Sequence, residues 1–111
     1  MIGPRDATSD VQIWLATAPV DMRKSFDSLA EVVRRFLGHD PLSGSLFVFR
    51  NKTSVRLKIL WWDRSGLVLY YKRLERGVFR FPGVKEPSLA IDSTQLLRLL
   101  EGLEVVARRA S

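Results

Sequence analysis

The segment from Leu46 to Pro82 limits the possible folds more than any other part of the chain. It alternates short apolar runs, rich in branched and aromatic residues, with turn-forming residues such as Asn, Asp, Ser and Gly. Connections this short join neighbouring strands that run in opposite directions, so the segment predicts an antiparallel meander. The expected strands are Leu46–Arg50, Val55–Trp62, Leu67–Leu74 and Val78–Phe81.

Helical patterns flank this meander. Apolar residues at helical spacing predict one helix over Met22–Leu37, with Asp21 as its N-cap and Gly38 after its end. A second helix is expected over Ser93–Glu101, where Asp92 and Gln95 have the spacing of a capping box. With a further strand at Val11–Ala16, the pattern predicts an α+β fold. We expect a single domain, 1–111, with a flexible arm at 1–10, an antiparallel sheet of four to five strands and both helices packed on one face.

Composition excludes several kinds of site. The chain has no cysteine, so disulfides and thiolate metal sites are impossible, and its single histidine, His39, has no cluster of carboxylates near it in the sequence. No apolar run reaches the length of a membrane span, and the polar N-terminus lacks the apolar core of a signal peptide. We therefore expect a cytoplasmic protein without membrane contact, metal or cofactor.

Positive charge is concentrated in the meander. Residues 41–85 contain ten Lys and Arg but only two acidic residues, whereas the segments on either side are slightly acidic. The net charge of +6 therefore comes from this one segment. Such a distribution favours an anionic partner that meets one surface of the protein.

The hairpin turns predict a register and hence two faces of the sheet. Pairing Trp62 with Leu67 sets Lys58 opposite Tyr71 and Arg56 opposite Arg73, and pairing Arg50 with Val55 sets Phe49 opposite Arg56 and Phe47 opposite Lys58. One face is then almost purely apolar, and we expect the helices to cover it. The other face combines cations with aromatic and apolar residues: Phe47, Phe49, Arg56, Lys58, Tyr71, Arg73, Leu60, Trp62, Leu67 and Leu69.

This second face is the candidate binding site. Arg56, Lys58 and Arg73 would neutralise phosphates, and Tyr71 offers a ring on which a base can stack. Two alternatives remain open at this point. The cations are also typical of a solvated sheet face that resists aggregation, and Phe47, Phe49 and Trp62 would form an apolar patch for a protein partner if the face is exposed.

No pattern of catalytic residues is present. Asp27 and Glu31 lie four residues apart on the first expected helix, beside Arg34 and Arg35, which is typical of a salt-bridged surface. The meander has only Asp63 and Glu75, both in turns, whereas a two-metal nuclease site usually needs more carboxylates. The sequence therefore indicates a protein that is not an enzyme.

Several motifs resemble a known family. The stretches PVDMRKSFDSLAEVV (19–33), DPLSGSLFVFRNK (40–52), KILWWDRSG (58–66) and LYYKRLERGVFRFP (69–82) are similar to the small accessory protein of insertion-sequence-66 transposable elements. This protein is the product of the second reading frame and is called TnpB in that family. The similarity runs in order through residues 11–82. It implies a bacterial protein that acts in transposition beside a separate, larger transposase, which carries the catalytic carboxylates.

The molecular role within transposition remains open between two hypotheses. In the first, the protein binds element DNA during assembly of the transposition complex; in the second, it docks onto the transposase without touching DNA. Within the matching motif, Arg23 and Lys24 would lie in the first turn of the helix, where cations oppose the helix dipole, so an anion contact there is a further hypothesis. A homo-oligomer is compatible with the sequence, which leaves oligomeric state and DNA preference open.

Overall fold

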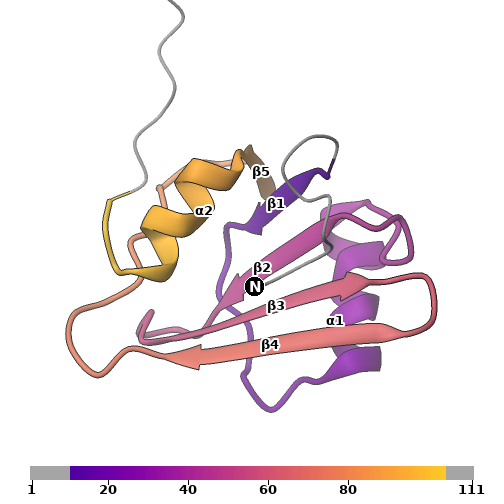
Figure 1. Ribbon diagram of the computed structural model, residues 1–111, viewed down its shortest axis with the longest axis horizontal. Coiled ribbons are helices and arrows are strands. Elements are labelled where there is room, and N and C mark those ends of the chain that lie inside the picture. The colour runs from indigo at the N-terminus through magenta and orange to yellow at the C-terminus, as the bar shows by residue number, and fades with distance from the viewer. Residues whose placement is uncertain (1–10, 105–111) are drawn as a thin grey trace, which may run out of the picture.

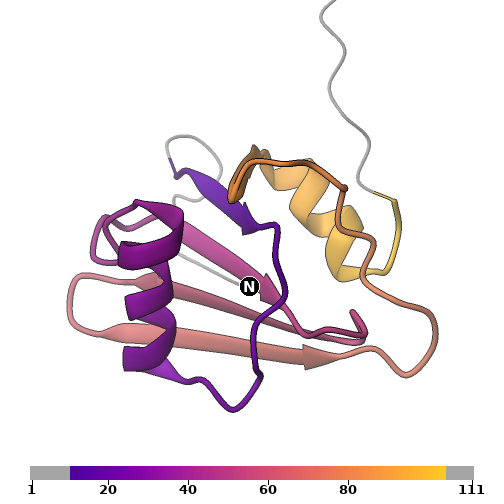
Figure 2. The same ribbon diagram turned by 180° about the vertical axis from the view of Figure 1, so that it is seen from behind.

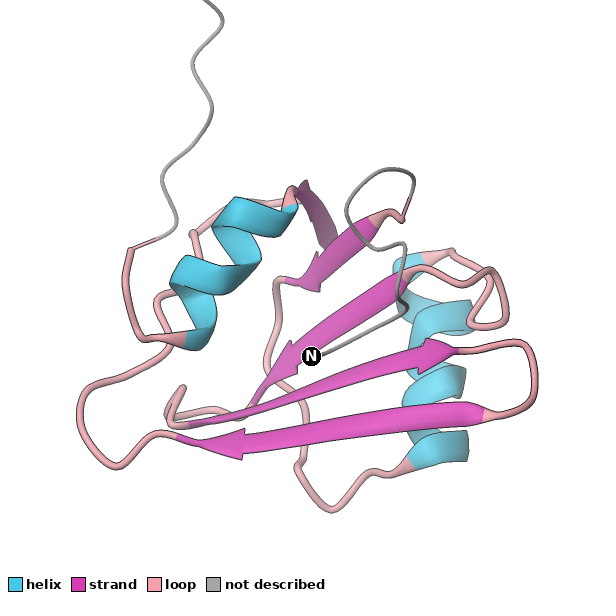
Figure 3. Ribbon diagram, in the orientation of Figure 1, coloured by secondary structure: helices cyan, strands magenta, loops and turns pink. Residues whose placement is uncertain are grey.

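The computed structural model describes residues 11–104, so the expected arm at 1–10 lies outside the described residues. It has a five-stranded sheet and two helices, which confirms the α+β class (Figure 1, Figure 3). The first helix continues into a turn of π-helix, labelled η1. The elements in chain order are β1 Ile13–Ala16, α1 Phe26–Val32, η1 Val33–Leu37, β2 Leu46–Arg50, β3 Arg56–Trp62, β4 Leu67–Arg73, β5 Ser88–Ile91 and α2 Ser93–Leu100.

The sheet is mostly antiparallel, with strand order β4-β3-β2-β1-β5. Strands β2, β3 and β4 form the expected meander. Strand β1 pairs with β2 in parallel, because α1 carries the chain across between them, and β5 pairs antiparallel with β1 at the far edge. The expected strand Val78–Phe81 is wrong. Phe79 is buried and its amide donates to the Ser54 carbonyl, but residues 78–81 form no strand. The remaining strand, β5, comes after Pro87 and pairs with β1 at the opposite edge of the sheet from β4.

The two helices lie on opposite faces of the sheet, which corrects the expectation that both cover one face. Figures 1 and 2 show α1 on one side of the meander and α2 on the other. The α2 side contains Leu96, Leu99 and Leu100 packed on alternate residues of the strands, including Val48 and Ile59. The α1 side contains Leu29, Val33 and Leu37 with Phe47, Phe49 and Leu60. Strands β2 and β3 are apolar at nearly every position, as expected for strands buried on both faces.

Helix α1 begins four residues later than expected. Ser25, not Asp21, is its N-cap, and the Ser28 hydroxyl accepts a hydrogen bond from the Ser25 amide at 2.9 Å. The other helix boundaries agree with the sequence. Gly38 has φ of 71°, the left-handed conformation expected after a helix end. Asp92 and Gln95 exchange side-chain-to-backbone hydrogen bonds of 2.8 Å, which is the predicted capping box.

The register of β3 and β4 is as predicted, with Lys58 opposite Tyr71 and Arg56 opposite Arg73. The register of β2 and β3 differs by two residues, so that Phe49 lies opposite Lys58 instead of Arg56. The cause is Asn51, whose Oδ1 accepts from the amides of both Val55 and Arg56 at 3.0 Å and closes a wider loop. A shift of two leaves every side chain on its predicted face.

Across residues 11–104, neither α1 with its π-helical extension nor α2 has the combination of length and apolar character that a membrane span requires.

Candidate nucleic-acid interface

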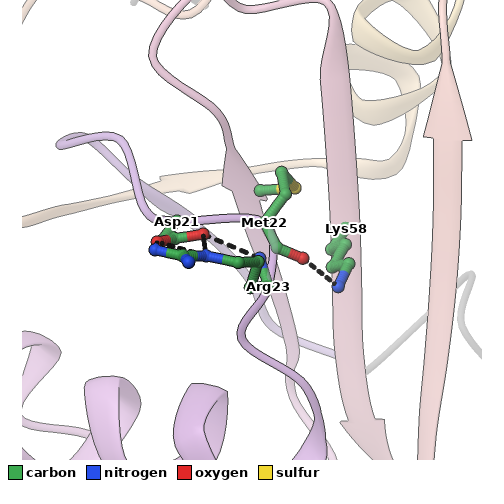
Figure 4. Close-up of polar contacts among 4 residues, drawn as sticks. All are labelled: Asp21, Met22, Arg23 and Lys58. Atoms are coloured by element: carbon green, nitrogen blue, oxygen red, sulfur yellow. Dashed lines mark hydrogen bonds and ion pairs between the residues drawn. The ribbon is translucent and has the colours of Figure 1, made fainter.

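Lys58 is part of the framework of the fold. Only 6% of the residue is exposed, and its Nζ donates to the carbonyl oxygens of Met22 and Lys24, each at 2.7 Å. The same Nζ lies 4.6 Å from the centre of the Tyr71 ring, which suits a cation–π contact. Lys58 therefore fastens the segment before α1 to the middle of β3, as Figure 4 shows for Met22. In this position its ammonium group is enclosed and has partners, so Lys58 is not available for the predicted contact with DNA.

Asp21 and Arg23 form a compact ion pair beside this anchor (Figure 4). The carboxylate accepts from the Arg23 amide at 2.8 Å and from the guanidinium Nη2 at 2.6 Å. These bonds, the guanidinium bond first, lower the pKa of Asp21 to about 2, and the same pairing raises the pKa of Arg23. The segment containing Arg23 and Lys24 precedes the helix, so the prediction that they occupy its first turn is wrong. Arg23 remains exposed, with its charge offset by Asp21.

Arg56 and Arg73 lie directly opposite each other on β3 and β4. Helix α1 packs at the other end of these strands, beside Leu60, Leu67 and Leu69 (Figure 1). Arg56 Nη1 donates to the Tyr71 hydroxyl at 3.0 Å, and Arg73 pairs with Glu75 at 2.9 Å. Tyr71 is 49% exposed and the Arg73 side chain 57%. The structure thus brings together three of the predicted DNA-contacting residues at one open end of the sheet.

Two further cations, which are not among the predicted site residues, flank this group. Lys52 lies in the loop between β2 and β3, and Arg76 lies in the turn after β4; both are exposed. The two connections meet, because the Phe79 amide donates to the Ser54 carbonyl at 2.6 Å. Lys52 and Arg76 could have been predicted from the sequence, because they lie in the two turns next to Arg56 and Arg73. We call Lys52, Arg56, Tyr71, Arg73 and Arg76 the basic end.

Phe47 and Phe49 do not form an exposed patch. Both are fully buried under α1, where they pack with Leu29 and Val33, and Trp62 is half-buried at the far end of β3. The expectation of an open apolar surface at Phe47 and Phe49 is therefore wrong. The cause is α1 itself, which covers this face, whereas the sequence pattern predicts both helices on the other one.

Other cations of the meander also serve the fold. Arg50 donates to the Thr17 carbonyl and the Ser54 hydroxyl, and its guanidinium lies 5.4 Å from the centre of the Phe81 ring. Lys72 donates to the Leu100 carbonyl at 2.8 Å, so it caps the end of α2 where a cation is favourable. The charge available to a partner is consequently smaller than the sequence count suggests. The basic end holds four of the seven remaining cations of the meander, and the other three, Arg64, Arg80 and Lys85, are exposed outside it.

No group of three or more His, Asp or Glu side chains that could hold a metal ion exists within residues 11–104. His39 stacks on Trp14 with ring centres 4.1 Å apart, and its Nε2 lies 3.3 Å from the Ser88 hydroxyl. Its surroundings are those of a packing residue that joins the loop after η1 to β5.

Comparisons with known proteins identify the family. Residues 11–110 match the family described as IS66 Orf2 like protein. Two uncharacterised proteins of Sinorhizobium fredii are similar: y4hO is 43% identical over 95 residues, covering 86% of this chain and 83% of the relative, and y4jC is 40% identical over 104 residues, covering 94% and 86%. No solved structure matches significantly. The chain therefore belongs to the IS66 Orf2-like family, and it is an accessory protein associated with the transposition of insertion sequences.

Proposed function

We propose that the protein binds DNA of its element through the basic end, as a non-catalytic accessory factor in assembly of the transposition complex. The observation that carries the proposal is the direct opposition of Arg56 and Arg73 on neighbouring strands. Like charges opposite each other destabilise a sheet, and a bridging anion such as a phosphate removes that repulsion.

The surroundings of the pair suit a nucleic acid better than a small anion. Lys52 and Arg76 extend the positive charge along both bordering turns, and Glu75 is the carboxylate paired there. The half-exposed ring of Tyr71 lies within the same group and offers a surface for a base where strands are separated. Arg56 and Arg73 would contact the backbone, which positions DNA without reading its sequence.

Fluorescence anisotropy with labelled element-end DNA, over a series of salt concentrations, tests the proposal. We expect affinity to fall steeply with salt, because each phosphate contact on duplex DNA adds about 0.9 to the logarithmic slope. Replacing Arg56 and Arg73 with Gln together should weaken binding and lower that slope by about 2.

A matched control removes the same charge elsewhere. Arg34 and Arg35, in η1, are exposed and both pair with Glu31 of α1, at 3.3 Å and 2.9 Å. Replacing both with Gln should leave the affinity nearly unchanged. An affinity insensitive to salt, or an equal loss in the two double variants, would argue against a contact at the basic end.

Docking onto the transposase is the second candidate function. One observation favours it: Phe36, in the π-helical turn η1, has 70% of its surface exposed. Replacing Phe36 with Ser should then abolish co-purification with the transposase after nuclease treatment, while salt-dependent DNA binding is retained.

A further inference from the structure

Strand β4 is a free edge of the sheet. It forms the end of the strand order, and no backbone hydrogen bond within residues 11–104 reaches its outer side. The opposite edge, β5, is only four residues long, whereas β4 has seven. Natural proteins usually shorten, cover or charge such an edge, because its free amides and carbonyls can pair with another strand. In β4 the charges are confined to Lys72 and Arg73, and the sequence before them is apolar or aromatic.

The hydrogen-bonding pattern defines which residues of β4 point outward. The Leu74 amide donates to Val55 and the Asp63 amide donates to Gly66, so even-numbered residues of β4 use their backbone groups toward β3. The backbone groups of the odd-numbered residues then face away from the sheet. These residues are Leu67, Leu69, Tyr71 and Arg73.

We infer that β4 pairs antiparallel with β4 of a second copy of this chain, on a two-fold axis at Tyr70. This register is the one that uses all seven residues, and it aligns the outward backbone groups of the two strands. It sets Lys72 opposite Val68 of the second copy and Arg73 opposite Leu67, so no two cations meet. An in-register parallel pair would place Lys72 and Arg73 against themselves, which is unfavourable.

The side chains beside this edge also suit a second copy. Helix α1 begins next to β4 in both views, and its first residue, Phe26, is 44% exposed (Figure 1, Figure 2). Leu67 and Leu69 are half-buried on the same side of the sheet. Because the axis is perpendicular to the sheet, both copies present this apolar border on the same face. The two Arg73 Cα atoms would lie about 20 Å apart along the strand direction.

Cysteine cross-linking tests the register, and the natural chain has no cysteine to interfere. The two Tyr70 positions form a non-hydrogen-bonded pair, whose Cα atoms lie about 4.5 Å apart, within reach of a disulfide. We expect a Tyr70→Cys variant to form a disulfide-linked dimer under mild oxidation. Val68→Cys alone should not, because the two positions would be about 14 Å apart, whereas a mixture of Val68→Cys and Lys72→Cys chains should cross-link. The mixture keeps the test valid where loss of the Tyr70 ring unfolds the protein.

Equal cross-linking of Val68→Cys alone and of the mixture would overturn the register, and absence of any cross-link in a folded variant would overturn the dimer. Sedimentation equilibrium of the full chain adds a second test with a matched pair of variants. In the dimer, each Val68 lies opposite Lys72 of the other copy. The Lys72 ammonium uses one of its three N–H groups for the Leu100 carbonyl, which leaves two for a new carboxylate. Val68→Glu should therefore tighten association about tenfold, whereas Val68→Lys should weaken it about tenfold. Both variants place a charge at the same half-buried position, so a shift in the same direction, or none, contradicts the pairing. This inference does not depend on DNA binding.

Discussion

The α1 face of the sheet has a covered half and an open end. Cations in the covered half stabilise the fold, whereas those at the open end are accessible to a partner. Lys58 lies in the covered half, with two backbone carbonyls and an aromatic ring around its ammonium group. Arg56 lies two residues earlier on the same strand and face, yet its guanidinium lies opposite Arg73 and is bonded only to the Tyr71 hydroxyl among the described residues. Lys58 and Arg56 thus carry the same charge and lie at alternate positions of one strand, yet Lys58 is structural and Arg56 is available to a partner. The covering segment before α1 makes the difference.

The largest expected effect tests whether the covered half is core. Replacing Phe49 with Ala removes a fully buried ring under α1 and should lower the free energy of unfolding by about 3–5 kcal/mol. Phe36→Ala is the matched control, because that ring is 70% exposed; its effect should be within about 0.5 kcal/mol. Equilibrium unfolding in urea measures both. Similar values for the two variants would mean that α1 does not cover this face.

The second prediction concerns Lys58. Replacing it with Met keeps the aliphatic stem but leaves the Met22 and Lys24 carbonyls without their donor, so we expect a loss of about 2–4 kcal/mol in unfolding free energy. Lys52→Met removes the same charge from an exposed turn and should change stability by about 0.5 kcal/mol or less. If both substitutions weaken DNA binding equally and neither destabilises the protein, Lys58 belongs to the binding surface after all.

The meander was predictable because its signals are local. Turn residues and alternation defined β2, β3 and β4 and the pairing of Arg56 with Arg73. The position of α1 was not predictable in this way. It depends on the crossover between β1 and β2, which pair in parallel although they are far apart in the chain. The apolar residues on both sides of β2, such as Phe47 and Val48, carried the relevant signal: a strand with four consecutive apolar residues, as in Leu46–Phe49, is typical of burial on both faces.

The candidate site residues also differ in whether local or distant parts of the chain determine their surroundings. Arg56, Tyr71 and Arg73 kept their predicted positions because a hairpin register is set by its own turn. Lys58 could not be assigned from the sequence, because its partners are backbone carbonyls of a segment more than thirty residues away, whose path no side-chain pattern describes.

The third prediction concerns the open end in the absence of DNA. In a double-mutant cycle with Arg56→Gln and Arg73→Gln, we expect an unfavourable coupling of about 0.5–1 kcal/mol at low salt. The coupling should shrink when salt is raised, since the pair is exposed, and when a DNA oligonucleotide is added. Urea unfolding of the four proteins at two salt concentrations measures it. A favourable or salt-independent coupling would mean that the two guanidinium groups do not repel each other.

The smallest expected effect concerns Asp21, which borders the covered half. Its folded pKa of about 2 is below the ordinary value of 3.8, so ionised Asp21 stabilises the folded protein above about pH 4, and this contribution is lost as the pH falls through 2. Thermal unfolding between pH 2 and 5 should therefore show wild type more stable than Asp21→Asn at the upper end, with the difference disappearing at the lower end. Asp63, whose pKa is lowered mainly by the Ser65 amide, acts in the same direction. Replacing both carboxylates with Asn should flatten the acid limb further than either substitution alone, and a difference that grows on acidification would contradict the assigned pairing of Asp21 with Arg23.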